Sequence, residues 1–359
     1  MSTIFISPSK YVQGSGAIFE LGQHVAPLGS RVLVVGGRTG LAQTKAGRDK
    51  SFADAGITQT ELVFSGESSE DAIAEVSAAA KAANADVLIA CGGGKAIDTV
   101  KAAAVASALR FVVVPTVASN DAPCSSVSVV YREDGSFDRL LFLGRNPDLV
   151  LVDTKIIANA PVRMLVAGMG DALATYYEAV AGRATGAVNV PGGQIPETAI
   201  TLARLCRDTL LEYGIGAILA VRKNVVTPAL ERIVEANTLL SGVGFESGAV
   251  ALAHALSEGL TTVPAAHKYL HGELVAFGLL AQLIHENTPH AEFSAVYGFC
   301  KSVGLPVTLA EIGITTAEEL MSACEVAAEP GRPSHNLQSP VTAESVFAAC
   351  QSVDAISEL

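Results

Sequence analysis

The sequence predicts two domains, an α/β domain over residues 1–161 with a parallel, Rossmann-like sheet and an all-helical domain over residues 162–359. Two observations carry this prediction. In the first part, short apolar runs alternate with helix-like segments, which is typical of parallel strands that are covered on both faces. After about Pro161 the strand signals nearly vanish, and long stretches rich in Ala, Leu and Glu follow. A chain of 359 residues is long enough for both domains.

The elements of the first part follow one another in a regular order. Strands are expected where β-branched or apolar residues run together, at 31–35, 58–64, 86–91 and 111–115. A helix follows the first strand and ends at Gly56, because glycine favours helix C-termini. A second helix begins with Glu70 and Asp71, whose charges suit a helix N-terminus, and runs to about Ala83. A third helix is expected over 96–108.

The second part consists of helices joined by short connections. The expected helices lie at 165–181, 196–212, 228–240, 249–260, 272–286 and 291–303. Residues 186–193 are rich in glycine and form a loop between the first two of these helices.

Composition excludes several classes of protein. The formal net charge of −12 argues against nucleic acid and anionic membranes as partners. No uninterrupted apolar run approaches the roughly 18 residues of a membrane span. The N-terminus has no basic region, so no signal peptide is expected. Six cysteines without a C-x-x-C pair are typical of reduced thiols in a cytoplasmic protein.

Three polar residues lie in apolar or Gly/Ala-rich surroundings: Asp171, His254 and His271. An ionised carboxylate and two imidazoles are costly to bury there without a partner. One divalent metal ion would satisfy all three. Three protein ligands with an open position are typical of a catalytic metal, so the sequence predicts such a site.

Residues 92–95, Gly-Gly-Gly-Lys, lie between an expected strand and an expected helix. Gly93 and Gly94 allow close approach of a ligand and a positive φ, and the helix N-terminus beyond offers N–H groups to a phosphate. Lys95 would add a charge, and Asp98 would orient the first turn. The loop is neither a Walker A motif, because Ala96 follows the lysine, nor a G-x-G-x-x-G motif. A phosphate loop is predicted, with a tight turn that binds nothing as the alternative.

The combination of this loop with the three metal candidates resembles the iron-containing (group III) alcohol dehydrogenase superfamily, and within it the glycerol dehydrogenases. Five motifs carry the resemblance, in the same order along nearly the whole chain. They lie at 118–125 (Ala-Ser-Asn-Asp-Ala-Pro-Cys-Ser), 152–155 (Val-Asp-Thr-Lys), 170–174 (Gly-Asp-Ala-Leu-Ala), 241–248 (Ser-Gly-Val-Gly-Phe-Glu-Ser-Gly) and 271–273 (His-Gly-Glu).

The resemblance implies a dehydroquinate synthase-like fold and oxidation of a small polyol, glycerol above all, by a nicotinamide cofactor. Asp171, His254 and His271 match the family's ligands to zinc, in whose place ferrous iron can stand. Asp121 matches a polyol-contacting position and His254 adjoins the polyol. Cofactor-contacting positions match Gly94, Lys95, Thr116, Ser119, Ser125, Val127 and Tyr131. A homo-octamer is the assembly that the family implies.

The position after the first strand departs from the family pattern. Glycerol dehydrogenases place an aspartate there, where it grips the hydroxyls of the adenosine ribose, whereas this chain has Gly37 followed by Arg38. Loss of the carboxylate removes repulsion towards a 2′-phosphate, with which Arg38 would pair. The hypothesis is that NADP(H) serves at least as well as NAD(H). The alternative is that Gly37 only loosens the binding of NAD.

The substrate and the reaction leave alternatives open. Phe245 is predicted to line the polyol pocket, and Phe142 offers no hydroxyl where relatives could have one. A more apolar pocket would favour a short 1,2-diol or an α-hydroxyketone. A lyase like dehydroquinate synthase would need several basic residues near the metal, where mainly Lys155 and Lys268 are available. A catalytically silent cofactor-binding protein is disfavoured by the intact metal residues and Asp121.

Two further residues invite a role and are assigned none. His267 lies four residues before His271, so the two would share one face of a helix, and a place at the rim of the site is expected. Cys124 adjoins Ser125, but no histidine follows at a position that would activate a nucleophilic thiol.

Overall fold

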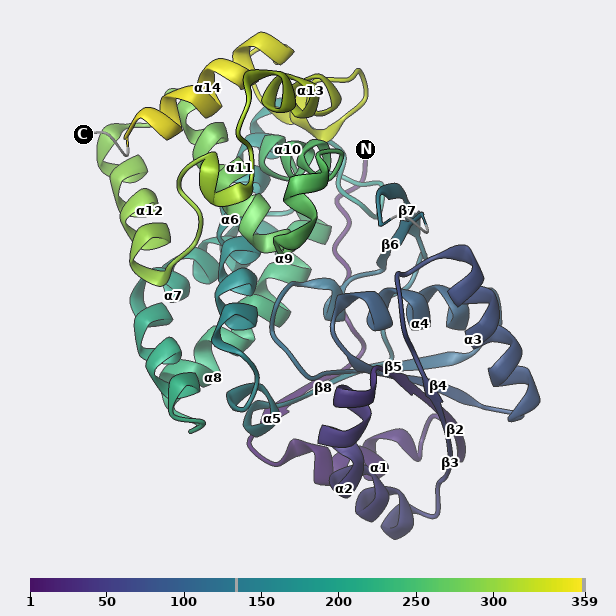
Figure 1. Ribbon diagram of the computed structural model, residues 1–359. Coiled ribbons are helices and arrows are strands. Elements are labelled where there is room, and N and C mark those ends of the chain that lie inside the picture. Colours follow the sequence, from purple (N-terminus) through teal and green to yellow (C-terminus); the bar gives the residue numbers. More distant parts are fainter. Residues whose placement is uncertain (133–134, 357–359) are drawn as a thin grey trace. The chain divides into compact units, whose positions relative to one another are not determined.

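The computed structural model describes residues 1–132 and 135–356. These residues form two compact units, and neither unit is a continuous stretch of chain (Figure 1). The α/β unit comprises Ser7–Leu165 and Leu219–Gly242, and the helical unit comprises Met1–Ile6, Val166–Ile218 and Val243–Leu359. The predicted boundary at 161/162 lies close to the first crossing. The prediction of two continuous domains differs from this arrangement, because residues 219–242 pack with the sheet and residues 1–6 with the helices.

The α/β unit is built on a six-stranded parallel sheet with the order β1-β8-β5-β4-β2-β3. Its strands are β1 (Tyr11–Gly14), β2 (Arg31–Gly36), β3 (Thr58–Val63), β4 (Val87–Gly92), β5 (Arg110–Pro115) and β8 (Leu149–Asp153). A separate antiparallel hairpin joins β6 (Val127–Tyr131) to β7 (Phe137–Phe142). All four expected strands are present, and the predicted fold class is confirmed. Strands β1 and β8 and the hairpin were not predicted.

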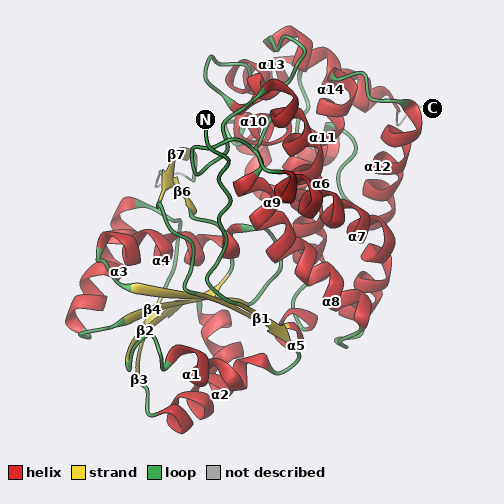
Figure 2. Ribbon diagram, turned by 180° about the vertical axis from the view of Figure 1, so that it is seen from behind, coloured by secondary structure: helices red, strands yellow, loops and turns green. Residues whose placement is uncertain are grey.

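Helices cover both faces of the parallel sheet, as Figure 2 shows, with α1 and α2 on one face and α3 and α4 on the other. The helices of this unit are α1 (Leu21–Val25), α2 (Arg38–Ala55), α3 (Glu70–Ala82), α4 (Gly94–Ala106), α5 (Thr154–Ala158) and α8 (Pro228–Glu235), which continues into a π-helical turn at Ala236–Leu240. The core between the layers includes Val34, Phe52, Ile89 and Val112, all at most 1% exposed. This burial on both faces explains why the inner strands β2, β4, β5 and β8 are almost purely apolar, whereas the edge strands β1 and β3 are not.

The helical unit contains long helices with short connections. Two of them cross between the units: α6 (Val162–Thr185) and α7 (Glu197–Arg222). The others are α9 (Ser241–Ser247), α10 (Leu252–Leu260), α11 (His271–His285), α12 (His290–Val303), α13 (Ala317–Ala327) and α14 (Ala343–Ile356). The expected helix over 249–260 begins later, at Leu252. Helices α13 and α14 were not predicted, although Thr316 and Glu319 form a capping box at the start of α13.

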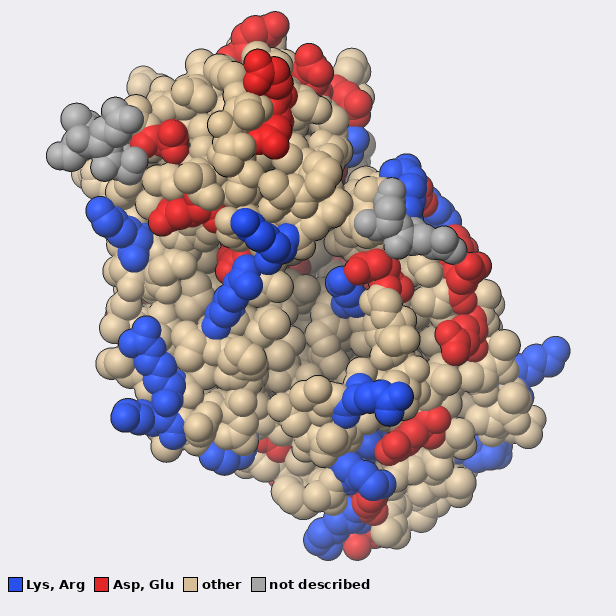
Figure 3. All heavy atoms as spheres, in the orientation of Figure 1, with Lys and Arg blue, Asp and Glu red and all other residues tan. Residues whose placement is uncertain are grey.

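Charges on the α/β unit lie in small groups of both signs (Figure 3). Along α2, Lys45 pairs with Asp49 at 2.9 Å and Lys50 pairs with Asp54 at 2.8 Å. Among the described residues, no single helix is long and apolar enough to cross a membrane. By length and composition alone, the pair Pro228–Ser247 and Leu252–Leu260 would suffice together, but it is bent by 107°.

Candidate functional site

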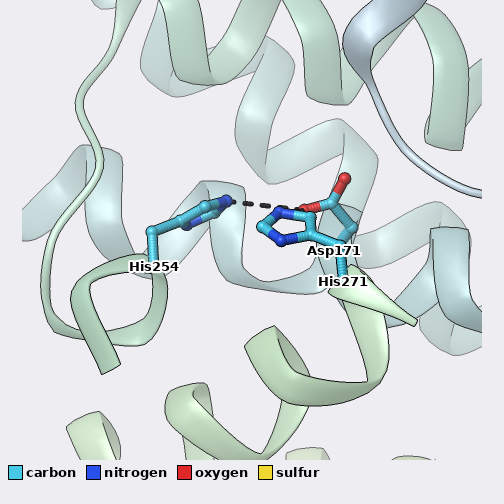
Figure 4. Close-up of side chains that lie close together, drawn as sticks. All are labelled: Asp171, His254 and His271. Atoms are coloured by element: carbon cyan, nitrogen blue, oxygen red, sulfur yellow. Dashed lines mark ion pairs between the residues drawn. The ribbon is translucent and has the colours of Figure 1, made fainter. Parts of the chain in front are cut away.

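The three predicted metal ligands meet inside the helical unit (Figure 4). Asp171 comes from the middle of α6, His254 from the first turn of α10, and His271 from the first residue of α11. Oδ1 of Asp171 lies 3.4 Å from Nε2 of His254 and 3.3 Å from Nε2 of His271. One donor atom from each residue lies within 4.8 Å of the others. One ion can therefore contact all three side chains.

Two glycines next to the ligands let their helices touch backbone to backbone. A Cβ atom on Gly170 would lie 2.2 Å from the carbonyl oxygen of Gly272. A Cβ atom on Gly272 would lie 1.8 Å from the carbonyl oxygen of Ala167 and 3.0 Å from the backbone nitrogen of Asp171. Any side chain at either position would separate α6 from α11. The close contact between Gly170 and Gly272, each of which adjoins a ligand in the sequence, thus brings Asp171 near His271.

A second carboxylate, on Glu178, holds the imidazole of His254 on the side away from Asp171. Glu178 lies on α6 and is fully buried. Its Oε1 accepts hydrogen bonds from the backbone N–H groups of Ala251 at 2.7 Å and His254 at 3.1 Å. Its Oε2 lies 2.5 Å from Nδ1 of His254. When the imidazole is neutral, as a metal ligand must be, this network assigns its proton to Nδ1, which leaves the Nε2 lone pair facing Asp171 and His271.

The sequence reasoning missed Glu178, although a signal was present. It follows Asp171 by seven residues, which is two helical turns, and therefore lies on the same face of α6. It also stands in apolar surroundings, as the three ligands do. Its spacing from Asp171 and its apolar neighbours together indicate a residue that belongs to the same site.

The electrostatics of the cluster suit a cation. Burial alone would raise the pKa of Asp171, but the charge of His271 and hydrogen bonds from both imidazoles outweigh it and hold that pKa well below its usual range. Burial alone would lower the pKa of His254, but Glu178 and Asp171 raise it well above the usual value. Two buried carboxylates thus favour positive charge at the imidazoles. A carboxylate with two imidazoles is also a ligand set that suits zinc, so these residues fit a divalent metal.

The glycine loop lies in the α/β unit, where β4 ends and α4 begins. The loop does not use the positive φ that glycine allows. None of the three residues 92–94 has a positive φ, and the φ of Gly93 is −96°. A Cβ atom on Gly94 would lie 2.4 Å from Nδ2 of Asn120, so the end of that side chain would have to move if Gly94 were replaced. Helix α4 starts at Gly94, and the side chain of Asn120 lies close to the backbone there. Lys95 forms an ion pair with Glu67 and remains largely exposed.

The other predicted cofactor contacts lie mostly in the segment between β5 and β6. The backbone N–H of Thr116 donates to the carbonyl of Gly92 at 3.0 Å, so this segment begins beside the glycine loop. Ser125 and Val127 are buried, whereas Ser119 and Tyr131 are half-buried. Asp98 does not face solvent at the first turn of α4. Its carboxylate is buried, with Oδ1 3.1 Å from Nζ of Lys101.

Asp121, the predicted polyol contact, lies in the same segment. It is half-buried, and its Oδ2 accepts a hydrogen bond from Oγ of Ser241 at 2.7 Å. The side chain of Asn237, one turn earlier, donates to the carbonyl of Ala118 at 3.0 Å. The π-helical turn and the start of α9 therefore hold the segment that carries Asp121.

Gly37 lies at the same edge of the sheet as the glycine loop. It precedes α2 directly, and a Cβ atom there would have no atom within 4 Å. Nearby, a Cβ atom on Gly40 would lie 2.5 Å from the carbonyl oxygen of Cys91, which brings the start of α2 against the end of β4. Arg38 is exposed in the first turn of α2. The space for an aspartate exists, but the carboxylate is missing.

The remaining residues that the sequence singled out lie as follows. His267 does not share a helix with His271, because it belongs to a 3-10 turn at Pro264–Lys268, where its Nε2 lies 2.7 Å from the carbonyl oxygen of Thr261. Phe245 is half-buried on α9, and Phe142 is 64% exposed at the end of β7. Cys124 is buried, as are the other five cysteines.

Known proteins resemble the chain over almost its whole length. The family model for iron-containing alcohol dehydrogenase matches residues 8–154. A glycerol dehydrogenase from Escherichia coli O6:H1 is 47% identical over 97% of this chain and 96% of its own length. A glycolaldehyde reductase from Halobacterium salinarum is 43% identical over 89% of this chain and 88% of its own. The crystal structure of a probable glycerol dehydrogenase from Sinorhizobium meliloti superimposes with a TM-score of 0.94 at 39% identity, covering 100% and 99% of the two chains.

Proposed function

The chain belongs to the iron-containing alcohol dehydrogenase family, and we propose that it is a zinc-dependent glycerol dehydrogenase. The observation that carries the proposal is the convergence of Asp171, His254 and His271 in a family whose relatives include glycerol dehydrogenases. Glycerol loses a hydride from its central carbon to the nicotinamide ring and a proton from the hydroxyl on that carbon. The products are dihydroxyacetone, the reduced cofactor and a proton. Two electrons leave the polyol and two enter the cofactor, so no side-chain nucleophile is required.

Asp171, His254 and His271 would hold the metal, and ferrous iron would fit the same ligands. A bound zinc ion supplies a Lewis acid that lowers the pKa of the reacting hydroxyl. Glu178 keeps the proton of His254 on Nδ1, so that Nε2 stays available. His254 would thus be a ligand to the metal, and we expect it also to adjoin the bound polyol.

Residues of the α/β unit would bind the cofactor and orient the polyol. The N-terminus of α4, with Gly93, Gly94 and Lys95, offers N–H groups and a positive charge to the pyrophosphate. The side chain of Asp121 would accept a hydrogen bond from a polyol hydroxyl, and the hydrogen bond from Ser241 keeps that carboxylate in place. The rest of the cofactor would contact Thr116, Ser119, Ser125, Val127 and Tyr131. Asp98 would act indirectly, through its ion pair with Lys101.

Metal removal tests the central proposal. Dialysis against dipicolinate should abolish glycerol oxidation, and zinc or ferrous iron should restore it, because each supplies the Lewis acid. The variant His271→Ala should lower metal content, measured by mass spectrometry of the metal, and kcat together. His267→Ala is the matched control and should change neither. Full activity in protein that is free of metal would contradict the proposal.

We also propose that the enzyme uses NADP(H) at least as well as NAD(H). Gly37 carries no carboxylate to repel a 2′-phosphate, and Arg38 is exposed beside it in the first turn of α2. Steady-state kinetics with both cofactors should give comparable or better kcat/KM with NADP. Gly37→Asp should shift the preference towards NAD by raising KM for NADP. A large preference of the unmodified enzyme for NAD would contradict this proposal.

Reduction of a short α-hydroxycarbonyl compound is the second candidate. It is favoured by the 43% identity to a glycolaldehyde reductase and by the half-buried Phe245, which offers no hydroxyl to a polyol. A screen of glycerol, 1,2-propanediol, dihydroxyacetone and glycolaldehyde with both cofactors separates the two candidates. The higher kcat/KM names the substrate class.

Assembly into a homo-octamer in the cytoplasm completes the proposal. Leu205, Ile215 and Leu219 on α7 are each about half exposed, and a second copy would cover such apolar side chains. All six thiols are free and buried, which suits a reducing compartment. Light scattering on the purified protein gives the number of subunits, and cell fractionation gives the compartment. A monomer in light scattering would contradict the proposed homo-octamer.

A further inference from the structure

Lys101 is a fully buried cation two turns into α4. Its ammonium group lies 3.1 Å from Oδ1 of Asp98, one turn earlier on the same helix. It also donates hydrogen bonds to the carbonyl oxygens of Ala122 at 2.8 Å, Ser125 at 3.3 Å and Val127. Oγ of Ser125 is a further acceptor at 3.3 Å.

The surroundings of Lys101 account for its burial. An ammonium group has three N–H donors and no acceptor, and its burial without partners is strongly unfavourable. Asp98 supplies the negative charge, and the three carbonyl groups supply acceptors. The carbonyls all belong to one segment, so Lys101 fastens that segment to the helix that begins at the glycine loop.

The fastened segment carries the residues that the proposed function needs. Only one short 3-10 turn, Ala122–Cys124, lies between β5 and β6, so the segment has few backbone hydrogen bonds of its own. Asp121 precedes the three carbonyls, and Ser125 and Val127 contribute two of them. Displacement of these carbonyls would displace the contacts to the polyol and to the cofactor.

We propose that Lys101 is a positioning residue that holds the segment 121–127 in the conformation that binds cofactor and polyol. It acts through the carbonyl groups of Ala122, Ser125 and Val127 and touches neither ligand. The proposal rests on the proposed function, because that function assigns Asp121, Ser125 and Val127 to the ligands. Without Lys101, the segment would adopt the binding conformation in only a fraction of the molecules. The apparent dissociation constant of the cofactor would then rise in inverse proportion to that fraction.

The first experiment measures the segment without any ligand. Hydrogen–deuterium exchange with mass spectrometry compares the unmodified protein with Lys101→Met, which keeps the aliphatic chain and removes the donors. Exchange should rise in peptides that cover 116–128. Arg48→Met is the matched control, since Arg48 is also fully buried in the α/β unit but bonds to Thr44, Gln59 and Glu61 instead. It should leave exchange at 116–128 unchanged.

The second experiment measures binding and turnover. Fluorescence titration with reduced cofactor should show a dissociation constant raised about tenfold or more in Lys101→Met, with a raised KM for glycerol. Arg48→Met, although less stable, should stay within about twofold of the unmodified enzyme in both constants. Where Lys101→Met fails to fold, Lys101→Gln serves instead, because its amide keeps two donors. Its changes should be in the same direction and smaller.

Two results would overturn the proposal. One is unchanged exchange at 116–128 with unchanged binding in the Lys101 variant. The other is an equal change in Arg48→Met, which would mean that any loss of a buried cation has this effect. If the unmodified protein bound neither NADH nor NADPH, the proposed function would fail. The exchange comparison needs no cofactor and would still decide whether Lys101 orders the segment.

Discussion

Glu178 determines which nitrogen of His254 is available to a metal. Its Oε1 already accepts two backbone N–H groups, so in Glu178→Gln the amide oxygen should occupy that position. The amide NH₂ would then face Nδ1 and favour the proton on Nε2, where the metal should bind. We expect zinc affinity to fall about 10- to 100-fold, as is typical when a carboxylate behind a ligating histidine is lost.

Competition with a chromophoric chelator measures this affinity without any assay of activity. Glu286→Gln is the control, because Glu286 is a half-buried carboxylate at the end of α11 that bonds to Gln282 and not to a ligand. Zinc affinity that stays the same in Glu178→Gln would show that the orientation of His254 does not depend on this carboxylate.

Single residues were predictable where a polar group interrupts apolar sequence. Asp171, His254 and His271 stood out for this reason, and the structure brings them together. Lys101 gave no such signal, because a lysine on an alanine-rich helix normally keeps its charge in water. Its burial depends on carbonyl groups more than twenty residues away, and no local pattern reports them.

At the scale of elements, the contact between α6 and α11 controls the geometry of the metal ligands. Gly272→Ala would place a methyl group 1.8 Å from the carbonyl oxygen of Ala167. The two helices must separate, and His271 must move away from Asp171. We expect a loss of stability of about 1–3 kcal/mol from this overpacking, together with weaker zinc binding.

Chemical denaturation and chelator competition measure the two effects separately. Gly298→Ala on α12 is the control, since a Cβ atom there would meet no atom within 4 Å. The expectation is wrong if Gly272→Ala lowers stability but leaves zinc affinity unchanged.

Most of the strands that the sequence predicted have a strong local pattern. Three of the four, β2, β4 and β5, are buried apolar runs. The fourth, β3, is polar and largely exposed at the edge of the sheet, and its signal lies in β-branched residues. Strand β1 escaped prediction because four half-buried residues carry little pattern. Strand β8 lies outside the predicted strands although it is a buried apolar run like β2, β4 and β5. The π-helical turn at Ala236–Leu240 looks like an ordinary helix in sequence, since only the backbone hydrogen bonds distinguish it.

For the whole molecule, the return of the chain to the α/β unit is the feature that sequence could not show. Residues 219–242 bring Glu231 to Gln13 and Thr154, with hydrogen bonds of 2.8 and 2.7 Å. They also bury Leu230 and Ile233 fully. Their composition is helical, so they were assigned to the helical domain. Contacts between distant segments, and not local composition, decide their place.

We therefore expect the fragment 7–165 not to fold cooperatively by itself. It lacks the helices that complete its core and the partners of Asp121 and Ala118. A fragment in which a Gly/Ser linker joins 7–165 to 219–242 should show a sharp thermal transition by circular dichroism. The same transition in the shorter fragment would contradict this expectation.

The order of segments along the chain also determines which unit can fold first during synthesis. The last residue of the α/β unit, Gly242, is translated before His254 and His271, although Asp171 has already been made. Because chains fold from the N-terminus as they emerge, the α/β unit can complete its fold while the metal site still has a single ligand. Binding of a metal ion by all three ligands would therefore come late in synthesis. A nascent chain of which only residues 1–253 have left the ribosome would contain the whole α/β unit and one of the three ligands.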